Sequence, residues 1–138
     1  MVTAIIVAAG KSERMGAGTD TAFLNLGPQP VVAWSLLAFE RCADVDQIVL
    51  VVRKDQLIAA KAVVRMFGIS KVRAVVAGGA KRQDSVMNGL KELDVDTRFV
   101  VVHDGARPCV RPETISEVVK LARRAGAAVV GCHIWDTV

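Results

Sequence analysis

Three short stretches of the sequence combine glycines with basic side chains, each directly after a run of apolar residues. They are residues 8–16, 78–85 and 103–108. Glycines let backbone N–H groups approach an anion closely, and lysine or arginine side chains neutralise its charge. Together the three stretches predict a binding site for a ligand that carries phosphate groups.

The first stretch differs from the two best-known phosphate-binding loops. Gly10 is not followed by the G-x-x-x-x-G-K-[ST] pattern of P-loop ATPases. The G-x-G-x-x-G pattern of dinucleotide-binding domains is also absent, because Ser12 stands where the second glycine would be. ATPase and NAD-dependent dehydrogenase functions therefore lose their main support, and a generic dinucleotide-binding domain is disfavoured.

The elements that must position these stretches are visible as apolar runs. Five runs rich in β-branched residues predict strands over Thr3–Ala8, Gln47–Val52, Val72–Ala77, Arg98–His103 and Ala127–Cys132. Each run is continuous rather than alternating, which is typical of strands buried on both faces of a parallel sheet.

Helical periodicity lies between the expected strands. Pro112–Ala125 places apolar residues on one face, with proline at its first position and Gly126 just after its end. A second helix is predicted over Ser85–Leu93, with Asp84 or Ser85 as N-cap. Two further helices are expected over Val31–Cys42 and Gln56–Phe67.

Alternating strands and helices predict an α/β fold: a doubly wound, mainly parallel sheet with helices on both faces. Residues 10–30 form a long stretch without periodicity directly after the first strand. In such sheets ligands bind at the carboxyl ends of the strands. We therefore expect the chemistry at that edge of the sheet.

Composition narrows the class of ligand. The 138 residues are 52% hydrophobic and 23% charged, which excludes a disordered or fibrous protein. The net charge of +4 suits a small anionic ligand. Aromatic residues make up only 4% and tyrosine is absent, so nucleic-acid binding by base stacking is disfavoured.

The sequence also predicts a cytoplasmic protein without membrane contact. Its longest apolar runs are much shorter than the roughly 18 residues of a membrane helix, and the N-terminus lacks the pattern of a signal peptide. Cys42, Cys109 and Cys132 are odd in number and show no C-x-x-C spacing, which disfavours disulfides and a zinc site. Cys42 and Cys132 are expected to be buried in apolar segments.

Four motifs in order along the chain add a family resemblance. They are A-A-G-x-x-x-R-M-G at 8–16, G-x-x-R-x-D-S-V at 79–86, V-H-D-G-A-R-P at 102–108 and D-T at 136–137. In this combination the chain resembles, over its whole length, the 2-C-methyl-D-erythritol 4-phosphate cytidylyltransferases of non-mevalonate isoprenoid biosynthesis. Molybdenum-cofactor guanylyltransferases share the form of the first motif alone.

The resemblance implies a reaction and an architecture. CMP would be transferred from CTP to the phosphate of 2-C-methyl-D-erythritol 4-phosphate, with release of pyrophosphate. The fold would be the Rossmann-like fold of nucleotidyltransferases, the cofactor Mg²⁺ or another divalent cation, and the full-length protein a homodimer. Phosphate attack in line with the leaving group makes such catalysis largely a matter of positioning and charge stabilisation.

The resemblance also implies roles for single residues. Arg14 would stabilise charge on the reacting phosphates, and position 21 belongs to the same catalytic set. The implied nucleotide-binding residues are Ala8, Ala9, Gly10, Lys11, Ser12, Gly79, Ala80, Ser85 and Gly105. Asp104 would contact both the metal ion and the substrate, while Arg107 and Thr137 would serve the acceptor side.

The chain departs from the family pattern at position 21. The family usually has a lysine seven residues after the arginine, where it bridges the phosphates, and this chain has Thr21. Loss of one such contact typically costs about 3–4 kcal/mol, or roughly 10²–10³ in rate. We therefore expect slow turnover with nucleotide binding retained.

A second departure is length. Family members continue into a β-arm that dimerises and then complete the sheet. Residues 1–138 are accordingly expected to form a single nucleotidyltransferase domain that lacks the C-terminal β-arm and the closing strands. Two alternatives stay open: a ribitol 5-phosphate cytidylyltransferase, whose loops are nearly the same, and a catalytically inactive nucleotide-binding module.

Some candidate residues also have simpler structural interpretations. His103 is expected to be a packed strand-end residue rather than a general base, because a phosphate nucleophile needs no proton removed at neutral pH. Asp104 could cap a turn through its Asp-Gly pair, and Ser85 could be only an N-cap. Trp34 is expected to be a core or interface anchor.

Overall fold

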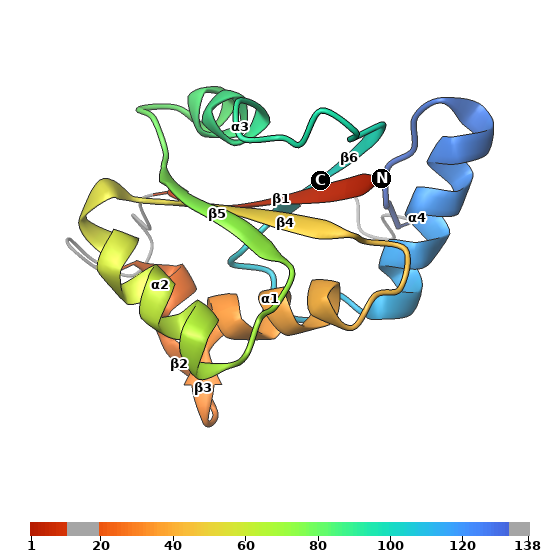
Figure 1. Ribbon diagram of the computed structural model, residues 1–138. Helices are drawn as coiled ribbons and strands as arrows, with labels where there is room; N and C mark the ends of the chain where they lie inside the picture. The colour runs from red at the N-terminus through yellow and green to blue at the C-terminus, as the bar shows by residue number, and fades with distance from the viewer. Residues whose placement is uncertain (11–19, 133–138) are drawn as a thin grey trace, which may run out of the picture.

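The computed structural model describes residues 1–10 and 20–132 and is built around a four-stranded sheet (Figure 1). Its strands are β1 (Val2–Ala8), β4 (Gln47–Val52), β5 (Val72–Ala77) and β6 (Phe99–Asp104), in the order β5-β4-β1-β6. All three pairings are parallel. The predicted α/β fold with a mainly parallel sheet is confirmed.

The two central strands explain why the apolar runs are continuous. Every residue of β1 is buried, and so are all residues of β4 after its first. Because both faces are covered, polar residues have no solvent-facing position to occupy there. β4 and β5 have the predicted bounds, and β6 is shifted by one residue from the prediction.

Helices cover the two faces unequally. α1 (Val31–Glu40), α2 (Leu57–Met66) and α4 (Pro112–Ala125) share one apolar core with side chains such as Ile6 and Leu50. On the other face α3 (Arg82–Leu90) packs over Ile5 and Val49. Figure 1 shows α3 above the sheet with α1 and α2 below it. The doubly wound arrangement is therefore confirmed.

α3 begins earlier than the sequence analysis predicts. The helix starts at Arg82 with Lys81 as N-cap, rather than at Ser85 with Asp84 or Ser85 as N-cap. The Asp84 carboxylate acts from within the first turn, where it accepts a hydrogen bond of 3.1 Å from the backbone N–H of Lys81. This side-chain bond satisfies a backbone donor before the apolar periodicity begins.

The predicted strand over Ala127–Cys132 is wrong. These residues have no regular secondary structure, and Val129 and Val130 are 89% and 61% exposed. Its apolar residues have no partner strand among the described residues, so the sequence pattern alone cannot form a strand. Cys132 is therefore exposed rather than buried as predicted, whereas the predicted burial of Cys42 is confirmed.

The described part of the long stretch after β1 has local structure. A 3₁₀ turn, η2 (Thr21–Phe23), is followed by a hairpin of β2 (Asn25–Leu26) and β3 (Gln29–Pro30). Gly27 supplies the positive φ of 66° that the turn requires. Trp34 is 37% exposed rather than a core residue, and its Nε1 donates to the Leu26 carbonyl at 2.9 Å. In residues 1–10 and 20–132, no helix is long and apolar enough to cross a membrane.

Candidate functional site

A cleft of about 1410 Å³ opens at the carboxyl ends of the four parallel strands. It lies at the edge where the sequence analysis expects the ligand site. Residues from all three glycine-containing stretches line it, together with the segment that follows β4. Its lining residues are Val7, Ala8, Ala9, Gly10, Asp20, Thr21, Ala22, Arg53, Lys54, Asp55, Gly78, Gly79, Ala80, Lys81, Arg82, Ser85, Asp104, Ala106 and Arg107.

The fold brings most of the candidate residues to this cleft. The lining includes Ala8, Ala9, Gly10, Thr21, Gly79, Ala80, Ser85, Asp104 and Arg107. Gly105 is buried directly behind the lining, where an added Cβ would lie 3.0 Å from that of Ala8. Lys11, Ser12, Arg14 and Thr137 lie outside the described residues.

The loop between β5 and α3 approaches the end of β1 very closely. A Cβ at Gly78 would lie 2.4 Å from the Cβ of Ala9 and 2.5 Å from Ser85 Oγ. Only a glycine therefore allows this contact between the first and second glycine-containing stretches. The result is a narrow wall of backbone groups around one end of the cleft.

Ser85, in α3, forms hydrogen bonds with the same loop. Its side chain is buried, and its Oγ accepts a hydrogen bond of 3.2 Å from the backbone N–H of Gly79. The hydroxyl lies 3.4 Å from the carbonyl oxygen of Lys81, to which it donates. Ser85 thus fixes the loop conformation from inside α3, which corrects its interpretation as an N-cap.

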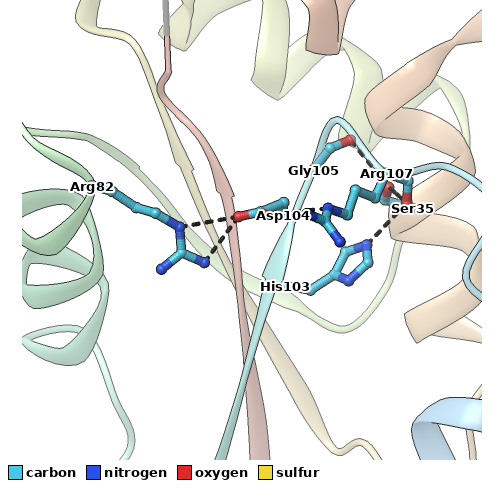
Figure 2. Close-up of polar contacts among 6 residues, drawn as sticks. All are labelled: Ser35, Arg82, His103, Asp104, Gly105 and Arg107. Carbon is cyan, nitrogen blue, oxygen red and sulfur yellow. Dashed lines mark hydrogen bonds and ion pairs between the residues drawn. The ribbon is translucent and has the colours of Figure 1, made fainter. Parts of the chain in front are cut away.

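Asp104 joins two arginines at the other end of the cleft (Figure 2). Nη2 and Nε of Arg82 donate to Asp104 Oδ1 at 2.9 and 3.2 Å. Arg107 Nε lies 3.5 Å from Asp104 Oδ2. The turn after β6 is closed instead by a backbone bond from Arg107 N–H to the Asp104 carbonyl, so the carboxylate does not cap it. Two cations around one carboxylate leave a positive surface here.

The loop that carries Asp104 and Arg107 is fastened to α1. The buried hydroxyl of Ser35 lies 3.1 Å from the carbonyl oxygens of both Gly105 and Arg107, and its one hydrogen serves these two acceptors. Sequence analysis missed Ser35. Its signal is a lone hydroxyl within the apolar segment Val31–Phe39, where a polar group needs a specific partner.

His103 supports the same loop. Its Nε2 donates to the Arg107 carbonyl at 3.0 Å, and its ring centroid lies 5.1 Å from that of Phe39. Burial, as the largest influence, lowers the pKa of His103 below its ordinary value, against the smaller effects of the Arg107 carbonyl and Asp104. The imidazole is therefore neutral at pH 7, and its expected role as a packed strand-end residue is confirmed.

A second charged wall follows β4. Arg53 Nη2 donates to Asp55 Oδ2 at 3.0 Å, and both residues line the cleft beside Thr21 and Asp20. Asp20 is only 7% exposed, and its Oδ1 accepts from the backbone N–H of Ala22 at 3.1 Å. Burial raises the pKa of Asp20, while the Ala22 N–H and the Arg53 charge act in the opposite direction. Sequence analysis missed this wall, although Arg53, Lys54 and Asp55 form a charged run directly after an apolar strand.

The described lining has a positive excess. It contains the basic residues Arg53, Lys54, Lys81, Arg82 and Arg107 and the acidic residues Asp20, Asp55 and Asp104. Because the bases outnumber the acids, an anion entering this cleft is attracted to it. The arrangement can bind phosphate groups from two sides.

The donor set at Asp104 fits a metal ion of one particular kind. Within residues 1–10 and 20–132, no three His, Cys, Asp or Glu side chains are grouped so that they could hold a metal ion. Magnesium, however, is commonly bound by one or two carboxylates together with the phosphates of a substrate. Asp104 therefore suits an ion shared with a phosphate ligand, but not a site made by the protein alone.

The chain is similar in sequence to proteins of one enzyme family. The family model for 2-C-methyl-D-erythritol 4-phosphate cytidylyltransferase matches residues 2–138. A curated protein of that name from Pelotomaculum thermopropionicum is 45% identical over 138 residues, which are 99% of this chain and 58% of the relative. Another from Alkaliphilus metalliredigens is 38% identical over 138 residues, 99% of this chain and 57% of the relative. The chain thus spans well under two thirds of these relatives.

Solved structures give the same result. A 4-diphosphocytidyl-2C-methyl-D-erythritol synthase from Anaerococcus prevotii superimposes with a TM-score of 0.76 at 31% identity, covering 89% of this chain and 51% of that chain. A second synthase of that name superimposes with a TM-score of 0.71 at 29% identity, covering 90% of this chain and 55% of that chain. The fold is therefore the Rossmann-like fold of these nucleotidyltransferases. From its motifs, its fold and these matches, the chain belongs to the 2-C-methyl-D-erythritol 4-phosphate cytidylyltransferase family.

Proposed function

We propose that this chain provides the nucleotide-binding part of an enzyme that transfers CMP from CTP to 2-C-methyl-D-erythritol 4-phosphate and releases pyrophosphate. The observation that carries the proposal is the cationic cleft at the carboxyl edge of the sheet, where three glycine-containing stretches meet. Family membership adds the cytidine nucleotide and the acceptor. The chain spans 57% of the Alkaliphilus relative, so the complete reaction belongs to the proposal rather than to the findings.

The nucleoside is proposed to bind between the ends of β1 and β5. Backbone groups of Ala8, Ala9, Gly79 and Ala80 line this part of the cleft, and Ser85 fixes its shape. Backbone N–H and C=O groups in a fixed loop can select one base by its hydrogen-bonding edge. Gly10, Lys11 and Ser12 would continue the same wall toward the phosphates, and Gly105 would leave space for the ribose.

The reacting phosphates are proposed to bind beside Asp104. Arg82 and Arg107 can exchange their bonds to this carboxylate for bonds to phosphate oxygens, because both side chains are more than half exposed and a guanidinium suits two oxygens of a phosphate. A Mg²⁺ or other divalent ion bound by Asp104 and the phosphates would supply further positive charge at the reacting phosphorus. Arg14 and Thr137 complete the proposed set, on the triphosphate and acceptor sides.

The chemical step needs little from acid–base groups. An oxygen of the acceptor phosphate forms a bond to the α-phosphorus of CTP, and the bond from that phosphorus to the pyrophosphate oxygen breaks. The nucleophile is already anionic at neutral pH, so no proton must be removed. This fits a neutral His103 whose Nε2 is occupied by a carbonyl oxygen. The protein's contribution is alignment and charge stabilisation.

Thr21 sets the expected rate. It lines the cleft but carries no charge, so it cannot stabilise the transferring phosphoryl group as a lysine would. We therefore propose slow transfer by this chain. We further propose that the full-length protein is a cytoplasmic homodimer.

The proposal is tested by product formation. CTP and Mg²⁺ are incubated with the chain and either 2-C-methyl-D-erythritol 4-phosphate or ribitol 5-phosphate, and the diphosphate product is followed by ³¹P NMR. The expected result is slow product formation with the methylerythritol acceptor only. Product with ribitol 5-phosphate alone would identify the other transferase. Binding of CTP without product from either acceptor would identify a nucleotide-binding module.

A further inference from the structure

Arg53 lines the cleft as a largely buried arginine whose ion-pair partner is exposed. It directly follows β4, which lies between β5 and β1 in the sheet. Its side chain is 24% exposed, whereas its ion-pair partner Asp55 is 63% exposed. An ion pair with one partner largely in water is weak and readily exchanged. The guanidinium is thus fixed along its stem but bound to a replaceable carboxylate.

Asp20 is a second carboxylate near this arginine, whose charge opposes the rise that burial causes in the pKa of the Asp20 carboxyl. Asp20 is more than nine-tenths buried and lines the same cleft. One of its oxygens, Oδ1, binds the Ala22 N–H, and the other, Oδ2, has no hydrogen-bond partner among the described residues. A buried carboxylate oxygen without a partner is costly, so it favours a nearby cation. Asp20 can therefore hold the guanidinium at the cleft when Asp55 releases it.

The cations of the cleft fall into two groups. Arg82 and Arg107 surround Asp104 at the end of β6, while Arg53 and Lys54 follow β4. Because β1 separates these two strands, the two strand ends lie about 10 Å apart. A ligand whose reacting phosphate lies beside Asp104 would extend its remaining phosphates toward the second group.

We propose that Arg53 binds the β- and γ-phosphates of the nucleoside triphosphate, which leave as pyrophosphate, by exchanging Asp55 for phosphate oxygens. Asp20 is the positioning residue that keeps its guanidinium at the cleft. This role rests on the proposed function of the site. A planar guanidinium suits two oxygens of one phosphate better than a lysine ammonium does.

The experiment compares ligands with and without the terminal phosphates. CTP, CMP and inorganic pyrophosphate, each with Mg²⁺, are titrated into the wild-type chain and the Arg53→Gln variant by calorimetry. We expect Arg53→Gln to weaken CTP and pyrophosphate binding about 10- to 100-fold and to leave CMP binding unchanged. Arg53→Lys should restore part of the affinity for CTP.

Two further variants serve as controls. Arg73, in β5, is likewise an arginine that forms an ion pair with an aspartate, Asp94, but it does not line the cleft. Arg73→Gln should therefore leave the affinities for CTP, CMP and pyrophosphate unchanged. Asp55→Asn frees Arg53 and should retain or increase CTP affinity. Arg53→Gln removes the positive charge near the buried Asp20 carboxyl and could destabilise the fold. If the single variant unfolds, the double variant Asp20→Asn/Arg53→Gln removes the buried charge as well and is titrated in its place.

The outcomes separate this role from the proposed function. Equal weakening of CTP and CMP by Arg53→Gln, or no weakening of either, would overturn the role of Arg53 and leave the cytidylyltransferase proposal intact. A folded wild-type chain that binds neither CTP nor CMP would overturn the proposed function and this role with it. Arg53-dependent binding of pyrophosphate without CTP binding would support Arg53 as a phosphate ligand and contradict the cytidine assignment.

Discussion

At the scale of single residues, Gly78 decides whether the β5–α3 loop can meet β1. Its α-carbon faces the side chains of Ala9 and Ser85, where a Cβ would be closer than 3.0 Å to both. We expect Gly78→Ala to cost about 1–3 kcal/mol of folding free energy by overpacking and to abolish CTP binding by displacing the loop.

The measurement is denaturant unfolding together with calorimetric titration. Gly131→Ala is the control, because an added Cβ there would meet nothing within 4 Å. If Gly78→Ala bound CTP as tightly as the wild type does, the nucleoside would not contact this loop.

Position 21 is the residue-scale test of slow transfer. Thr21→Lys places a cation on the cleft wall beside Asp20, and we expect turnover to rise about 10²- to 10³-fold. The measurement is pyrophosphate release with saturating CTP and 2-C-methyl-D-erythritol 4-phosphate. Thr21→Gln introduces a side chain that is nearly as long as lysine but uncharged, and it should not increase turnover. An equal increase in turnover in both variants would mean that charge at position 21 plays no part.

His103 predicts a pH dependence of stability. Burial lowers its pKa in the folded state, so between that value and the ordinary value of about 6.5 the unfolded chain binds more protons than the folded chain. The free energy of unfolding should therefore fall as the pH drops below about 6.5. Urea unfolding at a series of pH values checks this, and His103→Gln should show a smaller fall. An identical fall in both would assign the effect to other groups.

The candidate site was partly predictable at this scale. The glycine-containing stretches could be recognised because each follows an apolar run, and parallel strands bring their carboxyl ends to one edge. The pairing of Arg82 with Asp104 could not be predicted, since it joins residues 22 positions apart through side-chain geometry. Asp20 was missed because no local pattern marks a buried carboxylate, whereas Arg53 could have been found from the charged run that follows the apolar strand.

At the scale of elements, α1 fixes the position of the loop after β6 through hydrogen bonds. Ser35 is the polar residue of the buried α1 surface that reaches the carbonyl oxygens of Gly105 and Arg107. Ser35→Ala leaves these oxygens without that donor, and we expect a loss of about 1–3 kcal/mol of folding free energy. Arg107 should then be positioned less well, so acceptor KM should rise more than CTP affinity falls.

Urea unfolding and steady-state kinetics measure these two effects. Ser116→Ala is a matched control on α4, because among the described residues the Ser116 hydroxyl hydrogen-bonds to the weakly bonding Sγ of Cys42 at 3.3 Å. Equal losses of stability in the two variants would show that the Ser35 bonds add nothing specific.

Element boundaries were predictable where the chain carries end signals. α4 has the predicted bounds because Pro112 begins it and Gly126, with φ of 93°, ends it. α3 was predicted three residues late because its first turn is polar and charged, so apolar periodicity starts inside the helix. Residues 127–132 illustrate the opposite error: β-branched composition favours a strand, but a strand also needs a neighbour.

At the scale of the whole molecule, the outer strand β6 leaves apolar side chains exposed at one edge of the sheet. β6 ends the sheet order, and on its α3-facing side Val100 and Val102 are 37% and 41% exposed. Within the described part of the chain, no strand pairs with the outer edge of β6. An apolar edge of this kind promotes pairing between chains. We therefore expect this chain to self-associate as its concentration increases.

Val102→Lys should shift that association to higher concentration, because a charge on an edge strand opposes pairing. Sedimentation velocity over a concentration series measures the shift. Val95→Lys adds the same charge at a valine that is 97% exposed in a loop, and it should have little effect. A similar shift in both variants would mean that net charge alone governs association.

The cleft is proposed above all to bind a cytidine nucleotide, so the first measurement is calorimetric titration of this chain with CTP and Mg²⁺, with ATP and GTP as competitors. Binding tests the cleft without depending on Thr21 or on the acceptor. We predict saturable binding of CTP that needs the divalent ion and is not displaced by comparable concentrations of ATP or GTP. A folded chain that bound no CTP, or that preferred a purine nucleotide, would overturn the proposed cytidine-nucleotide site.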